Sequence, residues 1–327
     1  MKFRNSKAHR MKTALAVAAA LLMLELHAPA LQERSTKFVV GVLRRDGIVA
    51  PFATFDDGRW RARWPADIRS RELPISLDDV PESWWGLDPA PRTMTIWRDG
   101  ERAGAINLTA VTVSRLMCQP RIALKTDYKP AVPAPPPFEV PYPKDGLVVS
   151  GDVRIERIST VERGSAEWNR AVIFITPEFN REETTAARSF TSWTHPVEER
   201  QRKLLPITME AIYRAPMEDP EWTAYFVEAV RQYPPGRADR DGCGLATFAS
   251  GWVLVGPKEK AKIRLTAKVT YCDRKGVGYM LPFGLIRADG NIYWVFQFSG
   301  FEEEWYEIAE PNPDGVKGHV AFHAGGC

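Results

Sequence analysis

The sequence predicts a mainly β protein built from antiparallel meanders and hairpins. Short segments rich in β-branched and aromatic residues alternate with turn residues along most of the chain. Seven Asp-Gly dipeptides, a pair favoured in tight hairpin turns, separate many of these segments. The 26 prolines and 11 tryptophans suit loops and aromatic packing better than a helix bundle. We expect two β-rich domains with a small helical insertion.

The first thirty residues have the pattern of a secretory signal peptide. Basic residues precede an apolar run from Thr13 to Leu24, and Ala28 and Ala30 follow at the two positions that a signal peptidase reads. The run is too short for an ordinary membrane-spanning helix, and Glu25 interrupts it. We expect residues 1–30 to be cleaved, the protein to be exported to the periplasm or the extracellular space, and no stable membrane span to remain.

The charge balance disfavours a nucleic-acid partner. The whole chain has 44 basic and 41 acidic residues. Removing the five basic residues and one acidic residue of the signal leaves 39 and 40, a formal charge of −1. Nucleic-acid binding needs a basic patch that neutralises phosphates, and the sequence contains no such cluster.

The cysteines indicate disulfides in an exported protein. They are Cys118, Cys243, Cys272 and Cys327. Folding the segment between Cys243 and Cys272 about a loop at 256–259 pairs Val255 with Lys260 and separates a mostly apolar face from a mostly polar one. This register sets Cys243 opposite Cys272, so we expect a disulfide there, worth roughly 3 to 4 kcal/mol. Elimination then leaves Cys118 with Cys327.

The N-terminal half predicts a β domain over residues 35–128. Two-residue loops at Asp46-Gly47 and Asp57-Gly58 would align Phe38, Phe55 and Trp60 in one cross-strand row on a core face. A second hairpin is expected from Thr93 to Met117, turning at Asp99-Gly100.

Residues 129–146 predict a proline-rich linker. Seven prolines between 129 and 143 favour an extended, polyproline II conformation. We expect a stiff spacer between the two domains. The alternative is a docking segment for a partner that recognises proline-rich chains.

The C-terminal half, 147–327, predicts a larger β domain. The apolar run from Ala171 to Ile175 is interpreted as a strand. Asn180, with Glu183 three residues later, resembles a helix cap, which places helices at 181–190 and 196–205 and a helical insertion at about 180–205. The last long hairpin, from 279 to 299, has two apolar faces and should be central. Because several Asp-Gly spacings approach the length of a propeller blade, a β-propeller-like fold is the alternative.

A glutamate cluster is the main candidate for catalysis. Its members are Glu302, Glu303, Glu304, Glu307 and Glu310. Glycoside hydrolysis needs two carboxyl groups, and the strand neighbours Glu302 and Glu304 have a workable spacing. A glutamate run in a hairpin turn is, however, typical of a solvated tip, and no pattern here indicates a buried carboxyl group with a raised pKa.

The histidines near the C-terminus are weak candidates for a metal site. His319 and His323, followed by Cys327, are the only clustered soft ligands. Residues four apart on a strand are about 13 Å from each other, which is too far to share an ion. We expect no metal and no cofactor.

Two other pairs are candidates for ligand binding. Trp84 and Trp85 are adjacent on one short element, so we expect at least one ring to be exposed and able to stack on a ligand. Asp273 and Arg274 follow Cys272 directly, and a charged loop beside a disulfide is a reasonable place for a ligand contact.

These observations predict an exported, non-catalytic binding or structural module whose partner is an unidentified macromolecule or a glycan. The sequence contains no nucleophile elbow, no phosphate-binding glycine loop and no His-Glu-x-x-His motif. The alternative is a secreted hydrolase that acts on glycans through paired carboxylates.

Overall fold

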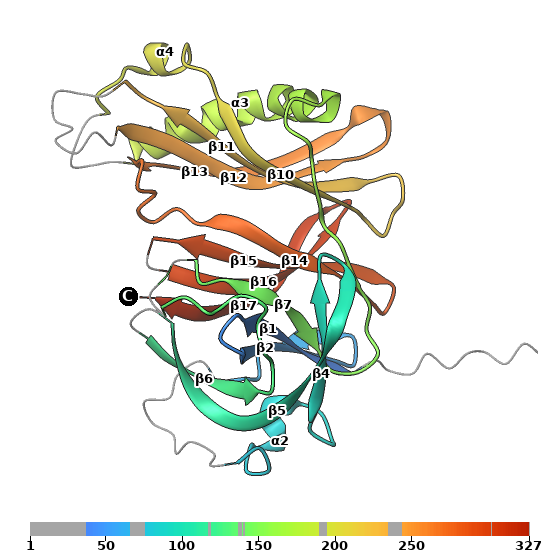
Figure 1. Ribbon diagram of the computed structural model, residues 1–327. Coiled ribbons are helices and arrows are strands. Elements are labelled where there is room, and N and C mark those ends of the chain that lie inside the picture. The colour runs from blue at the N-terminus through green and yellow to red at the C-terminus, as the bar shows by residue number, and fades with distance from the viewer. Residues whose placement is uncertain are drawn as a thin grey trace, which may run out of the picture. The chain divides into compact units, whose positions relative to one another are not determined.

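The computed structural model describes residues 37–65, 76–116, 119–136, 139, 141–189, 195–234, 244–301 and 303–326. This part of the chain is mainly β with antiparallel sheets, which confirms the predicted fold class. A barrel, two five-stranded sheets and one long helix lie in successive layers (Figure 1). The predicted signal peptide, Cys118, Cys243 and Cys327 lie outside the described residues.

The N-terminal half forms a closed barrel. Its elements are β1 (Phe38–Arg44), β2 (Ile48–Asp56), β3 (Arg59–Arg61), α2 (Glu82–Trp85), β4 (Thr93–Arg98), β5 (Glu101–Leu116), β6 (Gln119–Thr126) and β7 (Lys144–Val149). The strands follow the order β1-β7-β4-β5-β6-β2-β3, and pairing of β1 with β2 closes a ring of six. A closed arrangement of strands is compatible with the propeller-like alternative.

The predicted aromatic row is present on the outside of this barrel. Phe38 pairs with Phe55, and Phe55 pairs with Trp60. The ring centroids of Phe38 and Phe55 are 5.2 Å apart. A β-bulge between Val40 and Gly41 shifts the pairing nearer the turn, without changing the row.

The second layer, the middle sheet, packs on this outer face of the barrel. It has the order β17-β16-β15-β14-β8. The strands are β8 (Ile155–Glu156), β14 (Tyr279–Ala288), β15 (Asn291–Gly300), β16 (Glu303–Asn312) and β17 (Gly315–Gly326). The hairpin of β14 and β15 has apolar neighbours on both faces, as predicted: Tyr293 and Val295 face the barrel, and Trp294 and Phe296 face the next layer.

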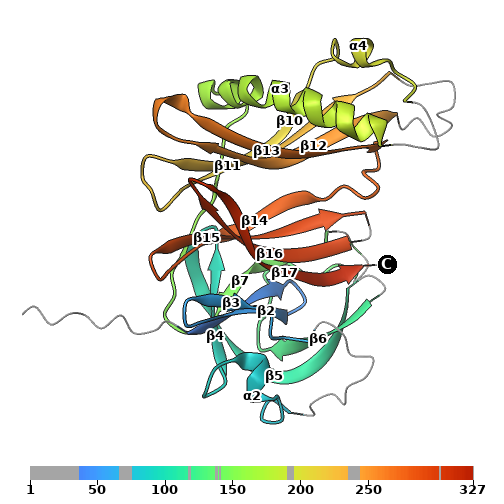
Figure 2. The ribbon, with the colours of Figure 1, turned by 180° about the vertical axis from the view of Figure 1, so that it is seen from behind.

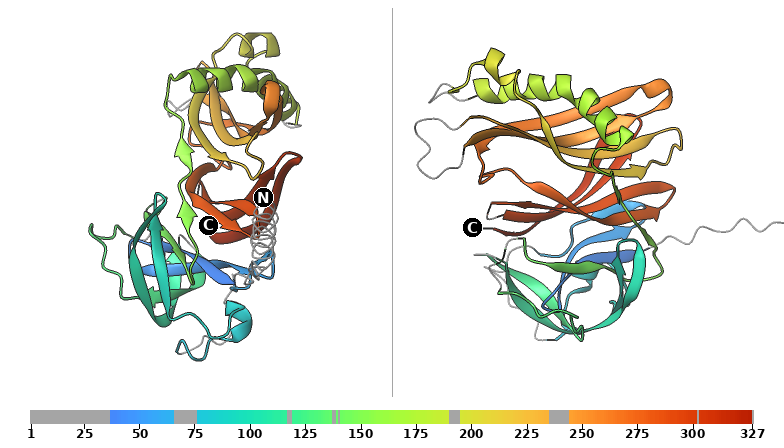
Figure 3. Two further views of the ribbon diagram at one scale, coloured as in Figure 1. Left: turned by 90° about the vertical axis from the view of Figure 1, so that its right-hand side faces the viewer. Right: turned by 45° about the horizontal axis from the view of Figure 1, so that its top comes forward.

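The third and fourth layers are the outer sheet and a helix. The outer sheet has the order β13-β12-β11-β10-β9. Its strands are β9 (Ser159–Thr160), β10 (Thr208–Pro216), β11 (Thr223–Gln232), β12 (Leu245–Val255) and β13 (Ala261–Tyr271), with the short helix η2 (Pro257–Glu259) between the last two. Helix α3 (Ala166–Arg188) covers its far face, and α4 (Glu199–Arg202) follows (Figures 2 and 3).

The predicted register of β12 and β13 is wrong by one residue. Val253 pairs with Ile263, and Val255 pairs with Ala261. The backbone N–H of Cys272 donates to the carbonyl oxygen of Gly244 (3.1 Å), so this register sets Cys272 opposite Gly244. The apolar pattern could not fix the register, because β12 is buried by α3 on one face and by the middle sheet on the other. Cys272 is disulfide-bonded, but its pairing with Cys243 remains a prediction.

The run from Ala171 to Ile175 is helical, not a strand. Ser165 caps α3 by accepting a hydrogen bond from the backbone N–H of Trp168 (3.1 Å). The helix then continues through Pro177 to Arg188. Its buried residues are Trp168, Ala171, Ile175, Phe179 and Glu183, which recur at helical spacing. Asn180 is therefore inside the helix and is not its cap.

The two halves of the chain share a core. Residues Thr36–Cys327 cluster as one compact unit. One buried cluster joins Phe38, Phe52 and Phe55 to Tyr306 and Phe322. The linker end predicted at residue 146 lies within β7, which pairs with β1 and β4 in the barrel. No helix among the described residues is long and apolar enough to cross a membrane.

Candidate functional site

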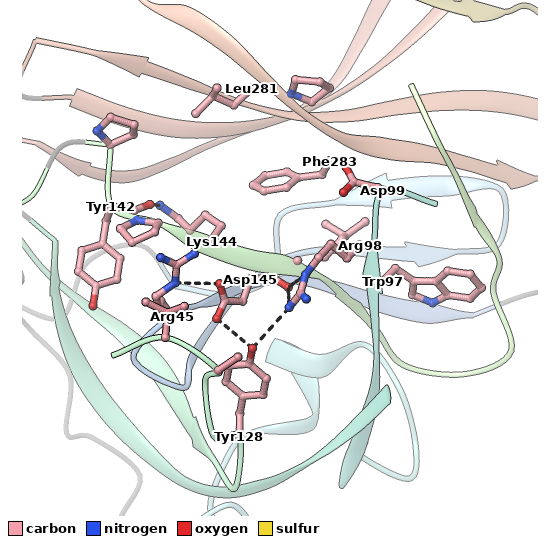
Figure 4. A pocket seen from close by; sticks show the side chains of 17 residues that line it. Arg45, Trp97, Arg98, Asp99, Tyr128, Tyr142, Lys144, Asp145, Leu281 and Phe283 are labelled. Carbon is pink, nitrogen blue, oxygen red and sulfur yellow. Dashed lines mark hydrogen bonds and ion pairs between the residues drawn. The ribbon is translucent and has the colours of Figure 1, made fainter. Parts of the chain in front are cut away.

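A pocket of about 490 Å³ lies where the barrel meets β14 of the middle sheet (Figure 4). This volume is within the range of small-ligand sites. The barrel supplies a polar side, the end of the proline-rich segment supplies a second wall, and β14 supplies an apolar wall. The lining residues are Arg45, Trp97, Arg98, Asp99, Tyr128, Ala131, Val132, Pro141, Tyr142, Pro143, Lys144, Asp145, Gly146, Leu147, Leu281, Pro282 and Phe283.

Asp145 organises the polar side of the pocket. Its Oδ1 accepts from Arg45 Nε (3.0 Å), and its Oδ2 accepts from the Tyr128 hydroxyl (2.9 Å). Its backbone oxygen accepts from Nε and Nη2 of Arg98 (3.1 and 3.0 Å). Asp145 is buried, so these hydrogen bonds stabilise a carboxylate that would otherwise be costly to remove from water. Its contacts hold three side chains from different parts of the barrel around one point.

Gly146 allows Asp145 to reach this position. The Asp-Gly pair here is not a turn but belongs to β7, which runs between β1 and β4. Gly146 has φ +142°, and a Cβ at this position would clash with the carbonyl oxygen of Trp97. Only glycine fits this close approach of β7 to β4.

We expect Gly146→Ala to lower the free energy of unfolding by about 2 kcal/mol more than Gly104→Ala. Both glycines lie in barrel strands, at φ +142° and +146°, so both variants pay the same backbone strain. A Cβ at Gly104 would meet nothing within 4 Å. Urea unfolding measures the stability of both variants, and the difference between them reports the clash of the added Cβ with Trp97. Equal losses of stability would show that β7 is not tightly fitted against β4.

A β-bulge places an aromatic ring on the opposite wall. The pairing of β14 with β15 shifts between Pro282 and Gly284, so Phe283 is the extra residue. Bulges commonly redirect a side chain beside a functional site. Phe283 therefore has no partner on β15, whereas Leu285 pairs with Trp294.

The end of the proline-rich segment forms a third part of the pocket. Its described residues contain no helix or strand before Lys144. Tyr142 is buried, and the Arg44 guanidinium carbon lies 4.4 Å from the centre of its ring. Val132, also on the pocket, is 56% exposed and therefore available to a ligand. The proline-rich segment therefore forms part of the wall of this pocket, in addition to any role as a spacer.

A buried ion pair lies next to the pocket. Nζ of Lys144 is 2.8 Å from Oε1 of Glu304, and it also donates to the backbone oxygen of Tyr142 (2.7 Å). Gln297 Nε2 and the Tyr306 hydroxyl donate to the same carboxylate, at 2.9 and 2.7 Å. Burial lowers the pKa of Lys144, and the charge of Glu304 opposes this effect. The pair joins the first strand after the proline-rich segment to the middle sheet.

The glutamate cluster does not form a solvated tip. Glu304 is completely buried, whereas its neighbour Glu303 is exposed. Glu304 shares a face of β16 with Tyr306, and Glu307 lies on the other face, where its carboxylate accepts from Trp305 Nε1 (2.6 Å). Burial raises the pKa of Glu307. Glu304 and Glu307 therefore cannot act on one bond. Glu302 lies outside the described residues.

Trp84 and Trp85 do not form an exposed platform. Trp85 is 1% exposed and Trp84 is 9% exposed. Both pack against Trp64, at ring distances of 5.5 Å for Trp84 and 4.9 Å for Trp85. Together with α2 these rings belong to the core inside the barrel. Adjacent side chains of a short element can both be buried when the element itself sits over the end of a barrel.

Asp273 and Arg274 have local structural contacts. Asp273 Oδ1 accepts from the backbone N–H of Lys275 (3.1 Å) within a turn. The guanidinium of Arg274 forms an ion pair with Glu210 and lies 4.7 Å from the centre of the Phe248 ring. Neither residue lines the pocket.

A buried carboxyl group lies near Arg274. Glu228, on β11, is 5% exposed, and its Oε1 accepts from the backbone N–H of Met280 (2.5 Å) across the two sheets. Burial raises the pKa of Glu228 to about 7. The hydrogen bond from the Met280 N–H and the charge of Arg274 lower this pKa, and the charge of Glu210 raises it.

The stability of the protein should therefore fall as the pH rises from about 4.5 to about 7. The folded state binds this proton more tightly than the unfolded chain, whose carboxyl group has its ordinary pKa of 4.5. Glu228 should contribute a loss of about 3 kcal/mol over this range. Glu228→Gln should remove that loss and stabilise the protein at pH 8. Urea titrations at pH 4.5, 7 and 8 measure this, and equal pH dependence in both proteins would contradict it.

The histidine candidates do not meet at one site. His319 Nε2 lies 2.7 Å from Glu310 Oε2, and its ring packs against Tyr293. His323 is exposed and pairs with Trp305 across the sheet. Within the described ranges, no group of three or more His, Cys, Asp or Glu residues is placed to hold a metal ion.

Sequence reasoning did not find the pocket. The three side chains that contact Asp145 come from sequence positions 17 to 100 residues away. One signal was present: Asp145-Gly146 ends the predicted linker and directly precedes the apolar residues Leu147 to Val149, as a strand start would. A scan against protein-family models, a search of curated proteins and a search of solved structures each found no match.

Proposed function

We propose that this chain is an exported, non-catalytic module that binds a glycan in the pocket around Asp145. The observation that carries the proposal is the composition of the pocket. Aromatic and proline side chains form its walls, and arginine, tyrosine and aspartate side chains form its polar side. Sugar rings present apolar faces that pack on aromatic rings and hydroxyl groups that bind fixed polar side chains.

Residues on both walls are available to such a ligand. Trp97 is partly buried at the end of β4, and Phe283 projects from the bulge in β14. The polar groups of the pocket are held in place by Asp145 and do not need to reorganise on binding. Preorganised polar groups lose less free energy on binding than flexible ones.

A binding role is favoured over hydrolysis by the arrangement of the carboxylates. Asp145 already accepts hydrogen bonds on both oxygens. Glu304 is enclosed by Lys144, Gln297 and Tyr306, and it does not line the pocket. Export rests on the N-terminal sequence pattern, and an exported location would give the protein access to envelope and extracellular glycans.

The test is calorimetry of the purified protein with a panel of neutral and acidic oligosaccharides. We expect binding by at least one of them, and a loss of roughly tenfold in affinity in Phe283→Ala. Phe301→Ala is the matched control, because Phe301 is 41% exposed and is not part of the pocket. Equal affinities in both variants, or no binding to any oligosaccharide, would overturn the proposal.

A further inference from the structure

Two guanidinium groups in the pocket contact the same residue, Asp145, but only one of them contacts its carboxylate. Arg45 contacts Asp145 through Nε, and Arg98 contacts the backbone oxygen of the same residue. The carboxylate of Asp145 can therefore neutralise only one of the two positive charges. Lys144, the other cation of the pocket, is neutralised by Glu304.

Terminal nitrogens of both arginines remain available. Among the described residues, Nη1 and Nη2 of Arg45 and Nη1 of Arg98 have no hydrogen-bond partner. The Arg45 side chain is 30% exposed, and Arg98 is exposed, so neither has to break a buried contact to meet a ligand. Guanidinium groups with free terminal nitrogens bind carboxylates through two parallel hydrogen bonds.

The remaining carboxylate of the pocket lies apart from Arg45. Asp99 is exposed in the turn after β4, and Figure 4 places it beside Phe283. A carboxylate in this position can accept hydrogen bonds from sugar hydroxyl groups. The pocket thus has a cationic group, Arg45, on one side and an accepting group, Asp99, on the other, with Arg98 between them in Figure 4.

We infer that the glycan is acidic and that Arg45 and Arg98 bind its carboxylate. This inference rests on the proposed function and adds the class of sugar, a uronic acid or another sugar with a carboxylate on its ring. Arg45 is fixed by Asp145 and acts as the rigid contact. Arg98 lies closer to solvent and contributes specificity. Asp99 and Tyr128 are placed to bind hydroxyl groups of the same ring.

The experiment compares two trisaccharides that differ only in charge. One is a uronic-acid trisaccharide, and the other is the same molecule with its carboxylates reduced to alcohols. Calorimetry with the full chain should show at least tenfold tighter binding of the acid at low salt, and the difference should shrink as salt is added. Arg98→Gln should reduce this preference at least threefold.

Arg264→Gln is the matched control, because Arg264 is an exposed arginine on β13, outside the pocket. Equal binding of the two trisaccharides would overturn the inference and leave the glycan-binding function standing. A preference that survives in Arg98→Gln and in Arg45→Lys would also overturn it. Binding of neither trisaccharide would count against both proposals.

Discussion

Glu304→Ala is expected to lower the free energy of unfolding by about 3 to 5 kcal/mol, the usual cost of leaving a buried charge without its partner. Glu304 is completely buried, and the side chain of Lys144 is 7% exposed. The substitution also removes the acceptor for Gln297 and Tyr306. Urea unfolding monitored by tryptophan fluorescence measures the loss.

Two further variants make this prediction specific. Glu303→Ala removes the exposed neighbouring glutamate and should change stability by no more than about 0.5 kcal/mol. Combining Glu304→Leu with Lys144→Met removes both charges, and it should recover part of the loss because no unpaired ammonium group remains. If Glu303→Ala and Glu304→Ala lower the free energy of unfolding equally, the ion pair does not link β7 to the middle sheet.

Glu183→Ala is expected to have a similarly large effect on stability, about 3 to 5 kcal/mol. Glu183 Oε2 accepts from Arg231 Nη1 (2.5 Å), and its Oε1 accepts from the Tyr233 hydroxyl (2.6 Å). Arg202 is also buried, with its Nε 3.8 Å from this carboxylate. The variant removes the carboxylate next to the guanidinium groups of Arg202 and Arg231, which lie between α3 and the outer sheet.

The matched control is Glu182→Ala, on the adjacent position of α3. Glu182 pairs with Arg181, which is 68% exposed, so its loss should cost less than about 1 kcal/mol. Hydrogen exchange should show faster exchange along α3 in Glu183→Ala only. Unchanged exchange along the helix would mean that this network does not hold α3 on the sheet.

Local patterns predicted much of the fold. The two Asp-Gly turns fix the row of Phe38, Phe55 and Trp60, and the two apolar faces of the last hairpin identify it as central. The apolar pattern failed to predict the register of a strand that is buried on both faces. Strand β12 is covered on both faces, so a shift of one residue exposes no apolar side chain, and the register cannot be read from the sequence.

The long helix was missed for a related reason. Five apolar residues from Ala171 to Ile175 fit a buried strand as well as a helix. Asn180 and Glu183 were interpreted as a cap because of their spacing. In the structure the same spacing puts both on one face of α3, where both contact Arg231.

The site depends on contacts that no local pattern records. Asp145 contacts residues of the turn after β1, of β4 and of the segment after β6, and these meet only when the barrel closes. The buried state of Glu304 likewise depends on Lys144, which is 160 residues away. Composition could indicate binding, but the position of the pocket requires the tertiary structure.

Hydrogen exchange of the full chain, with and without a saturating uronic-acid trisaccharide, tests the position of the site most directly. Slower exchange is expected around Trp97, Asp145 and Phe283, which surround one pocket although they are far apart in sequence. Another pocket, of about 330 Å³, lies between α3 and the outer sheet near Phe174 and Val255. Slower exchange confined to that pocket would contradict a site at the barrel.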